Sequence, residues 1–420
     1  IVDEEHETSY KQYDPAPRYH ARNAAIVLAQ MYGAKVLLGS ATPAVESYYN
    51  ALSGKYGLVE LHTRYANNPL PEVRIVDMRE QRRKRLAKGN FSEPLLEQMR
   101  GALKREEQVI LFQNRRGFAP MVECRECAWI PKCTQCDVSL TYHKRDNRLV
   151  CHYCGYSVPI TEACPSCGEK AIRLSGFGTQ KIEDELSVLL PDAKILRMDT
   201  DSTSGKNSHE KLFESFSKGE YDIMIGTQMV AKGLNFPNVT LVGVVSVDQQ
   251  LYNDDFRSLE KTFSLLTQVV GRSGRGEFKG TAVIQTLTPE NEIIQLAAKQ
   301  DYDAFFETEI RLRKALIYPP YCDICVVSSQ SCFKDEAQNA INGIFDNIRE
   351  MLKGEYQDVK LVILGPAPAG VARVNNRYRY RMIIKCRNNK KFRCMLKKAL
   401  DIKLVKDVSV SVDINPETII

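Results

Sequence analysis

Short apolar segments alternate with amphipathic segments through the middle of the chain. We predict strands at 108–113, 194–199, 221–227, 239–245 and 280–286. We predict helices at 179–190, 208–218, 258–271 and 290–300. Apolar strands that alternate with helices are typical of a parallel sheet with helices on both faces. The pattern therefore predicts an α/β domain over residues 106–305.

The first 105 residues carry a similar alternation. We predict strands and helices there at 35–39 and 73–78, and at 18–30 and 44–53, respectively. The charged run 79–88 indicates a solvated connection, and the alternative is a contact with DNA phosphates. We expect residues 1–105 to form the C-terminal part of another α/β lobe.

The last part of the chain has a different rhythm. Strands and helices are predicted in the order β-α-β-β-α-β, at 323–329, 334–353, 360–364, 378–387, 390–401 and 408–414. This order predicts a split βαβ fold and hence an α+β domain over 306–420. Basic residues, amides and tyrosines gather at 373–381, where alternation places Tyr378 and Tyr380 on one strand face and Arg379 and Arg381 on the other. This strand is either a nucleic-acid face or a solvated basic edge.

Composition restricts the setting of the protein. No apolar run approaches the roughly 20 residues that span a bilayer, and no signal peptide is visible. We therefore expect a cytoplasmic protein. The formal net charge of +6 permits a nucleic-acid partner without establishing one.

Eight of the 13 cysteines lie between residues 124 and 167, all in Cys-x-x-Cys pairs. The pairs are Cys124 with Cys127, Cys133 with Cys136, Cys151 with Cys154, and Cys164 with Cys167. In a reducing compartment this pattern indicates metal rather than disulfides. Two pairs supply four thiolates, which close one tetrahedral structural zinc site, so we expect two zinc ions.

The pairing of the cysteines has two solutions. Nested pairing joins the outer pairs (124/127 with 164/167) and the inner pairs (133/136 with 151/154), whereas sequential pairing joins neighbours. We prefer the nested arrangement, because it closes a small finger within a larger one. Iron–sulfur binding is the alternative to zinc. The module 124–167 interrupts the predicted sheet after its first strand and is therefore an insertion.

The chain begins with two apolar residues and then Asp3, Glu4, Glu5 and His6. Carboxylates at a strand end suit Mg²⁺ beside a nucleotide: Asp3 would hold the ion and Glu4 would activate water. The alternative is a solvated acidic segment. A phosphate-binding loop of the G-x-x-x-x-G-K-[ST] type is absent from the sequence. Either the chain has no nucleotide site or the loop lies upstream of residue 1, and we favour the second.

The segment 268–276 carries Gln268, Arg272 and Arg275 among three glycines. We expect the two arginines to lie on one side of a helical turn. Guanidinium groups bind phosphoryl oxygens in a fork and stabilise the charge that develops during nucleotide hydrolysis. The alternative is a Gly-rich basic helix terminus.

Three further segments contain candidate contacts to nucleic acid. The loop after His6 mixes basic and aromatic residues, such as Tyr19 and Arg22, that suit unpaired bases and phosphates. The same tyrosines would serve equally as packing anchors of a surface loop. Thr227 and Arg115 each follow a predicted strand directly, where a backbone phosphate can bind. Asp248, after the next strand, is a plausible polar partner.

These motifs together resemble the superfamily 2 helicases. Motif II corresponds to residues 3–6, motif III to 39–42, motif IV to 114–117, motif V to 226–236 and motif VI to 268–275. The cysteine module, the aromatic loop, Tyr318-Pro319-Pro320 and Leu364-Gly365-Pro366 narrow the resemblance to the family of primosomal protein N′, the replication-restart helicase PriA. The resemblance covers nearly the whole chain.

The resemblance implies two RecA-like lobes, the first one partial, and a role for each candidate residue. It implies catalytic roles for Asp3, Glu4, Gln268, Arg272 and Arg275. It implies nucleotide coupling by His6, Thr42, Gly233 and Asp248. It implies DNA contacts by Tyr19, Arg22, Arg115, Thr227, Arg377 and Arg379.

The resemblance also implies an activity: ATP- and Mg²⁺-dependent 3′-to-5′ DNA unwinding that recognises abandoned forks and promotes primosome assembly. The implied partners are forked and single-stranded DNA, single-strand DNA-binding protein, and the proteins that load the replicative helicase. The family's N-terminal DNA-binding domains and phosphate loop are missing from the sequence, so we expect the chain alone, a monomer, to be inactive. The alternative is a zinc-dependent DNA-binding and assembly module without ATPase activity.

Overall fold

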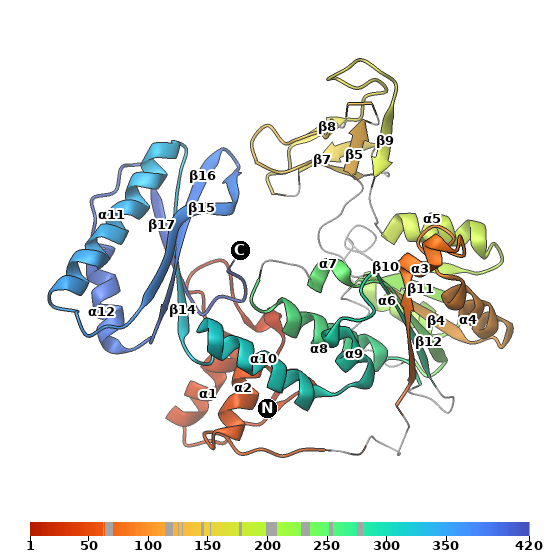
Figure 1. The fold of residues 1–420 in the computed structure, drawn as a ribbon, viewed down its shortest axis with the longest axis horizontal. Helices are drawn as coiled ribbons and strands as arrows, with labels where there is room; N and C mark the ends of the chain where they lie inside the picture. Colours follow the sequence, from red (N-terminus) through yellow and green to blue (C-terminus); the bar gives the residue numbers. More distant parts are fainter. Residues whose placement is uncertain are drawn as a thin grey trace.

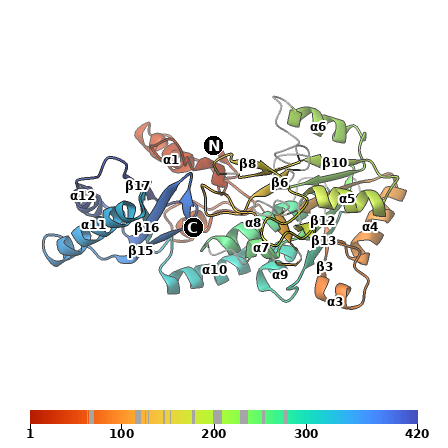
Figure 2. The same ribbon diagram turned by 90° about the horizontal axis from the view of Figure 1, so that it is seen from above.

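The computed structural model describes most of the chain. The described ranges are 1–61, 63, 70–113, 121–124, 126–127, 129–143, 147–151, 153–175, 179–198, 208–227, 236–251, 255–274 and 280–419. Figure 1 shows a parallel sheet with helices at one end, an antiparallel sheet covered by helices at the other, and a small cysteine-rich module above them. Seen from above in Figure 2, the two sheets remain at opposite ends of the molecule.

Over the described residues, the central sheet contains six strands, and all neighbouring pairs are parallel. Its order is β10 (Ile195–Met198), β11 (Ile223–Gly226), β4 (Gln108–Gln113), β12 (Val239–Ser246), β13 (Thr281–Thr286) and β3 (Glu72–Asp77). Every residue of β4 is buried. Val109 and Leu111 enter one core, whereas Ile110 and Phe112 enter the other. The predicted parallel sheet with both faces covered is therefore confirmed.

Helices pack on both faces of this sheet. One core contains residues of α4 (Glu93–Lys104) and α5 (Thr179–Leu189). The other contains residues of α6 (Ser208–Ser217), α8 (Ser258–Val270), α9 (Glu292–Lys299) and α10 (Tyr302–Leu316). The sequence sets the start of α4, because Ser92 accepts a hydrogen bond from the Leu95 amide as N-cap. The short helix α7 (Asp248–Leu251) follows β12.

Strand β3 corrects our assignment of residues 1–105 to a single separate lobe. It pairs in parallel with β13 along its whole length, from Glu72 to Asp77. Strand β3 and helix α4 thus belong to the central sheet and its core. The charged run after β3 is also more ordered than predicted, since it begins with helix α3 (Met78–Arg83), which Asp77 caps.

The first 60 residues form a smaller unit. Strands β1 (Val2–Asp3) and β2 (Leu38–Gly39) pair in parallel. The short helix η1 (Thr8–Tyr10), α1 (Ala21–Met31) and α2 (Val45–Leu52) complete it. Only the last two residues of the predicted strand 35–39 pair, and α1 begins at Ala21 rather than at residue 18. Among the described residues, no helix combines the length and apolarity that crossing a membrane requires.

In the described part of the cysteine-rich module there are two small antiparallel sheets. Strand β5 (Met121–Cys124) pairs with β9 (Ile172–Ser175). Strands β6 (Thr141–His143), β7 (Arg148–Val150) and β8 (Ser157–Pro159) form the other sheet. Apolar side chains pack between the cysteine knuckles in a core of their own. The module is inserted between β4 and α5 of the central domain, as predicted.

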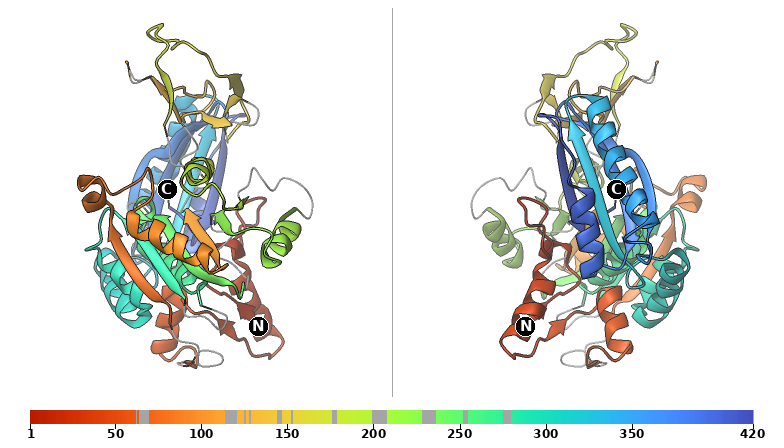
Figure 3. Two further views of the ribbon diagram at one scale, coloured as in Figure 1. Left: turned by 90° about the vertical axis from the view of Figure 1, so that its right-hand side faces the viewer. Right: turned by 90° about the vertical axis from the view of Figure 1, so that its left-hand side faces the viewer.

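The C-terminal part has the predicted β-α-β-β-α-β order. Its elements are β14 (Asp323–Ser331), α11 (Lys334–Lys353), β15 (Val362–Val374), β16 (Arg377–Cys386), α12 (Lys390–Ala399) and β17 (Ser409–Ile414). The antiparallel sheet has the order β15-β16-β14-β17. Helices α11 and α12 cover the same face (Figure 3). Tyr380 is buried beneath them, and Tyr378 packs against the same core, so the predicted tyrosine face of the strand is a packing face.

Candidate functional site

The acidic candidates lie where β1 ends. Asp3 is the last residue of β1 and is exposed, and its Oδ1 accepts a hydrogen bond from the Glu4 amide at 3.0 Å. Glu4 has a φ of +48°, which residues with a side chain rarely adopt. The chain therefore turns sharply at Glu4. Two carboxylates are placed in succession at the edge of a parallel pair of strands.

His6 connects three of the motifs that the sequence singled out. Its Nδ1 lies 2.7 Å from Oγ of Ser40, which follows β2, and its Nε2 lies 2.9 Å from Nε2 of Gln268 on α8. The Gln268 amide nitrogen can only donate, so His6 Nε2 accepts and Nδ1 carries the proton that is donated to Ser40. Ser40 Oγ also accepts from the Thr42 amide at 3.0 Å. The end of β1 is thereby tied to the segment after β2 and to α8.

Glu5 is a buried centre of contacts that the sequence did not reveal. Only 1% of the residue is exposed. Its carboxylate accepts hydrogen bonds from Arg22 Nη1 at 2.7 Å, from the Ala44 amide at 2.6 Å and from Ser47 Oγ at 2.8 Å. Glu5 thus fixes α1 and the start of α2 relative to the acidic segment. The predicted DNA contact Arg22 is already held in this buried ion pair.

A second buried network joins α2, α8 and α10. Arg313 of α10 is 1% exposed and lies 2.7 Å from Glu309, 2.8 Å from Glu260 of α8 and 3.2 Å from Glu46 of α2. Arg257 adds a second ion pair to Glu46, at 2.7 Å. Burial by itself would raise the pKa of Glu260, but Arg313 and Arg257 outweigh burial and lower that pKa to about 2. The network holds the first 60 residues against the central domain.

The arginine candidates lie beyond the end of α8. The helix ends at Val270, and Arg272 lies in the following turn, where its amide donates to the Val269 carbonyl at 3.1 Å. Its side chain is buried. Arg275 lies outside the described residues, as do Gly233 and Arg115. Their predicted roles stay predictions.

The remaining coupling candidates differ in their contacts. Thr42 is fully buried, and its Oγ1 has no hydrogen-bond partner among the described residues. Asp248 begins α7, and its carboxylate accepts from Thr286 Oγ1 at 2.6 Å and from the Leu287 amide at 3.0 Å. It thereby closes the turn after β13. Thr227 follows β11 and is partly buried.

The remaining DNA candidates differ in their accessibility. Tyr19 is 48% exposed in the loop before α1. Arg377 donates through Nη2 to the Asp407 carbonyl at 2.6 Å and is thereby held against the C-terminal domain. Arg379 lies on the helix-free face of the C-terminal sheet, opposite Tyr378 and Tyr380, as the alternation predicts.

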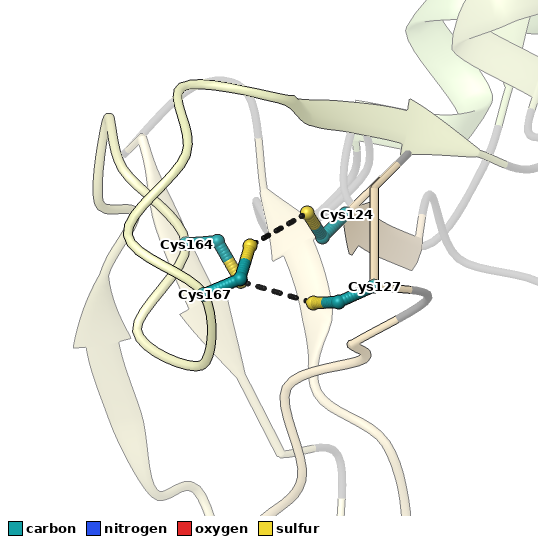
Figure 4. A group of neighbouring side chains, drawn as sticks. All are labelled: Cys124, Cys127, Cys164 and Cys167. Carbon is teal, nitrogen blue, oxygen red and sulfur yellow. Dashed lines mark hydrogen bonds between the residues drawn. The ribbon is translucent and has the colours of Figure 1, made fainter.

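The eight module cysteines form two groups of four. Cys124, Cys127, Cys164 and Cys167 converge in one group, and Figure 4 shows their four sulfur atoms facing a common centre. Cys133, Cys136, Cys151 and Cys154 form the other. In each group all Sγ atoms lie within 4.8 Å of one another. This is the nested pairing that we preferred.

The geometry of both groups fits tetrahedral zinc. The Sγ atoms of Cys124 and Cys167 are 3.6 Å apart, as are those of Cys127 and Cys164, and those of Cys133 and Cys154. A tetrahedron with zinc–sulfur bonds of about 2.3 Å has edges of about 3.8 Å. Four thiolates leave no coordination position for water. The two groups therefore fit structural rather than catalytic zinc.

We expect two zinc ions per chain by metal analysis. Replacing Cys136 by Ser should remove one of them and leave the other, because each group supplies all four of its own ligands. The matched control is Cys332→Ser, which alters an exposed cysteine outside both groups and should leave two. An iron chromophore, or a single zinc in the unaltered protein, would contradict the assignment.

Comparison with known proteins agrees with this arrangement of parts. The family model described as "PriA DNA helicase Cys-rich region (CRR) domain" matches residues 133–159. "Helicase conserved C-terminal domain" matches residues 168–277, and "Primosomal protein N C-terminal domain" matches residues 314–417. The three models follow one another in the chain without overlap.

Curated relatives match the chain from end to end. Replication restart protein PriA of Bacillus subtilis (strain 168) is 45% identical over 424 residues, which cover 99% of this chain and 51% of that protein. The protein of the same name from Haemophilus influenzae is 38% identical and covers 99% and 56%. The one from Chlamydia pneumoniae is 39% identical and covers 100% and 56%. The chain belongs to the PriA family.

The chain spans about half the length of these PriA relatives. It combines a helicase-like α/β fold, a cysteine-rich module with two four-cysteine groups and a C-terminal antiparallel domain, and the family models match within each of these parts. In this PriA-family chain, sequence reasoning missed the buried contacts of Glu5 and the network around Arg313. The only local signal for Arg313 is Glu309 one helical turn before it.

Proposed function

We propose that this chain carries part of the motor of an ATP-dependent DNA helicase that unwinds in the 3′-to-5′ direction and restarts replication at abandoned forks. The observation that carries the proposal is the hydrogen-bonded link from Ser40 through His6 to Gln268. It joins the acidic segment of one α/β unit to the helix of the other that precedes the arginines. A motor needs such a link, because nucleotide hydrolysis at one unit must cause a conformational change in the neighbouring unit.

The chemistry of the donors supports the assignment of roles. Asp3 presents an exposed carboxylate at the end of β1, and oxygen is the ligand that Mg²⁺ prefers. Glu4 follows on a sharp turn and would orient or deprotonate water. Arg272, and Arg275 in the same segment, would neutralise phosphoryl charge from the other side. When bound, Mg²⁺ would offset the charge of the phosphate oxygens.

Measuring ATP hydrolysis by the full-length gene product tests this proposal. We expect ATP hydrolysis to depend on single-stranded DNA, and a forked duplex with a 3′ tail to be unwound in preference to one with a 5′ tail. Glu4→Gln should abolish hydrolysis while nucleotide binding persists, since the water-activating group alone is changed. Asp14→Asn, an exposed acid nearby, is the matched control. DNA-independent hydrolysis, or none, would refute the motor assignment.

A zinc-dependent DNA-binding and assembly module without ATPase activity is the second candidate. The observation that favours it is the complete set of two four-cysteine groups, which need nothing outside the chain. This second function predicts that the protein binds forked DNA, that this binding is lost when zinc is removed, and that the protein does not hydrolyse ATP. The same hydrolysis measurement therefore separates the two functions.

The PriA relatives suggest where and with what the chain works. By their name they restart replication. We assign it forked and single-stranded DNA as ligands, and single-strand DNA-binding protein and replicative-helicase loaders as partners, in the cytoplasm. Tyr19, Thr227 and Arg379 would contact DNA, and Arg115 would join them. Sedimentation with a forked oligonucleotide tests both the binding and the expected monomer.

A further inference from the structure

The hairpin between β15 and β16 ends on the cysteine-rich module. Its turn residues Asn375 and Asn376 have φ values of +49° and +56°, which a two-residue type I′ turn requires. Val374, at the end of β15, packs against the apolar core of the module. From the sequence, this segment is either a nucleic-acid face or a solvated basic edge. In the structure its tip is instead covered by the inner cysteine knuckle.

Backbone hydrogen bonds join the hairpin tip to the knuckle that carries Cys133 and Cys136. The Asp137 amide donates to the Arg373 carbonyl at 2.9 Å, and the Asn376 amide donates to the Gln135 carbonyl at 2.8 Å. Arg373 Nε also donates to Asp137 Oδ1 at 3.1 Å. The hairpin therefore pairs with the knuckle almost as a neighbouring strand would.

One contact reaches the metal-binding group itself. The Asn375 amide donates to Cys136 Sγ at 3.0 Å. The knuckles also donate internally, from Gln135 to Cys133 and from Ser166 to Cys164, but those N···S distances are 3.4 Å. A thiolate bound to zinc keeps negative charge, which an N–H group stabilises. Donors of this kind raise metal affinity by about 10–100-fold in other sites.

We propose that the C-terminal domain completes the inner zinc site by supplying the Asn375 amide to Cys136. The zinc site and the hairpin then stabilise each other. Zinc holds the knuckle in the conformation that binds the hairpin, and the bound hairpin slows the loss of zinc. Asn375 and Arg373 act as positioning residues, since neither is a ligand. The outer group, Cys124 with its three partners, has no such donor from the C-terminal domain among the described residues.

The release of zinc to a chromophoric chelator measures this dependence in the whole chain. Asn375→Pro removes the amide donor and also disrupts the turn, because proline fixes φ at about −65° whereas Asn375 has a φ of +49°. We expect it to speed release from the inner site by at least about 10–100-fold while the outer site is unchanged. Asn375→Gly keeps the amide and tolerates positive φ, so its rate should stay close to that of the unaltered protein. Alkylation of cysteines during release, mapped by mass spectrometry, shows which group opens first.

A second variant guards against a general loss of folding in the proline variant. Arg373→Ala leaves the turn intact and removes only the side-chain contact with Asp137, while the backbone hydrogen bond between the two residues remains. It should therefore speed release from the inner site by a smaller factor. Selective opening of the inner group in both variants supports the proposal. Unchanged release in both, equal acceleration at the two sites in Arg373→Ala, or a glycine variant as fast as the proline variant overturns it. The readout needs no ATP, so its failure would be independent of the motor assignment.

Discussion

Replacing Arg313 by Met should lower the free energy of unfolding of the central unit by about 3–5 kcal/mol, because it leaves buried carboxylates without their cation. Glu309, Glu260 and Glu46 all lie within 3.2 Å of the Arg313 guanidinium nitrogens. Arg257 would remain paired with Glu46 and Glu260, so Glu309 would lose the most electrostatic stabilisation. For a unit of this size the change corresponds to a fall in Tm of roughly 6–20 °C. Circular dichroism on heating measures it.

The same helix supplies the control for this prediction. Arg311 forms an (i, i+4) pair with Glu307, as Arg313 does with Glu309, but Arg311 is 77% exposed. Arg311→Met should therefore shift Tm very little, since exposed pairs contribute about 0–1 kcal/mol. Adding Glu309→Gln to Arg313→Met should recover part of the loss, because it removes an uncompensated buried charge. Equal shifts for the two arginine variants would mean that the network stabilises nothing.

Acidification also tests the network, because it protonates the carboxylates that pair with Arg313. The pKa of Glu260 is about 2, below its usual value of 4.5, so the stability from this group is complete above pH 4.5 and is lost as the pH falls towards 2. Burial raises the pKa of Glu309 instead, so protonation of that group relieves a cost rather than adding one. The Tm of Arg313→Met should consequently fall less steeply between pH 4.5 and 2 than that of the unaltered protein.

The sequence predicts a strand well when its burial is continuous. Strand β4 was located residue for residue, because a short continuous apolar run, here Val109–Phe112 between two glutamines, is typical of a buried strand of a parallel sheet. Strand β3 was also recognised, yet its sheet was not. The sequence pattern of Glu72–Asp77 indicates a strand but not the strand with which it pairs, since the choice of partner depends on tertiary packing.

The same limit applies to the site. Glu309–Arg313 and Glu307–Arg311 have identical spacing in the sequence, and only tertiary packing buries the first and exposes the second. Spacing likewise gave the eight cysteine ligands but left their pairing open. Alternation placed Arg379 opposite Tyr380, whereas docking of the hairpin tip at Asn375 depends on a surface more than 230 residues earlier in the chain.

Replacing Arg272 by Ala should reduce DNA-stimulated ATP turnover by about 10³-fold or more in a protein whose hydrolysis has been demonstrated, because such a guanidinium stabilises transition-state charge. Arg272 is buried in the turn after α8, four residues beyond the Gln268 that contacts His6. Arg275→Ala should act in the same way. DNA affinity should be preserved in both variants, since neither arginine is assigned to DNA.

Arg272→Lys separates charge from geometry at this position. Lysine keeps the positive charge but loses the planar fork, so turnover should remain well below that of the unaltered protein while exceeding that of Arg272→Ala. Arg311→Ala, an exposed arginine on α10, should leave turnover unchanged. If Arg272→Ala retained turnover within about ten-fold, less than 1.4 kcal/mol of barrier would depend on it. The buried guanidinium would then serve the fold of the turn after α8 rather than the chemistry.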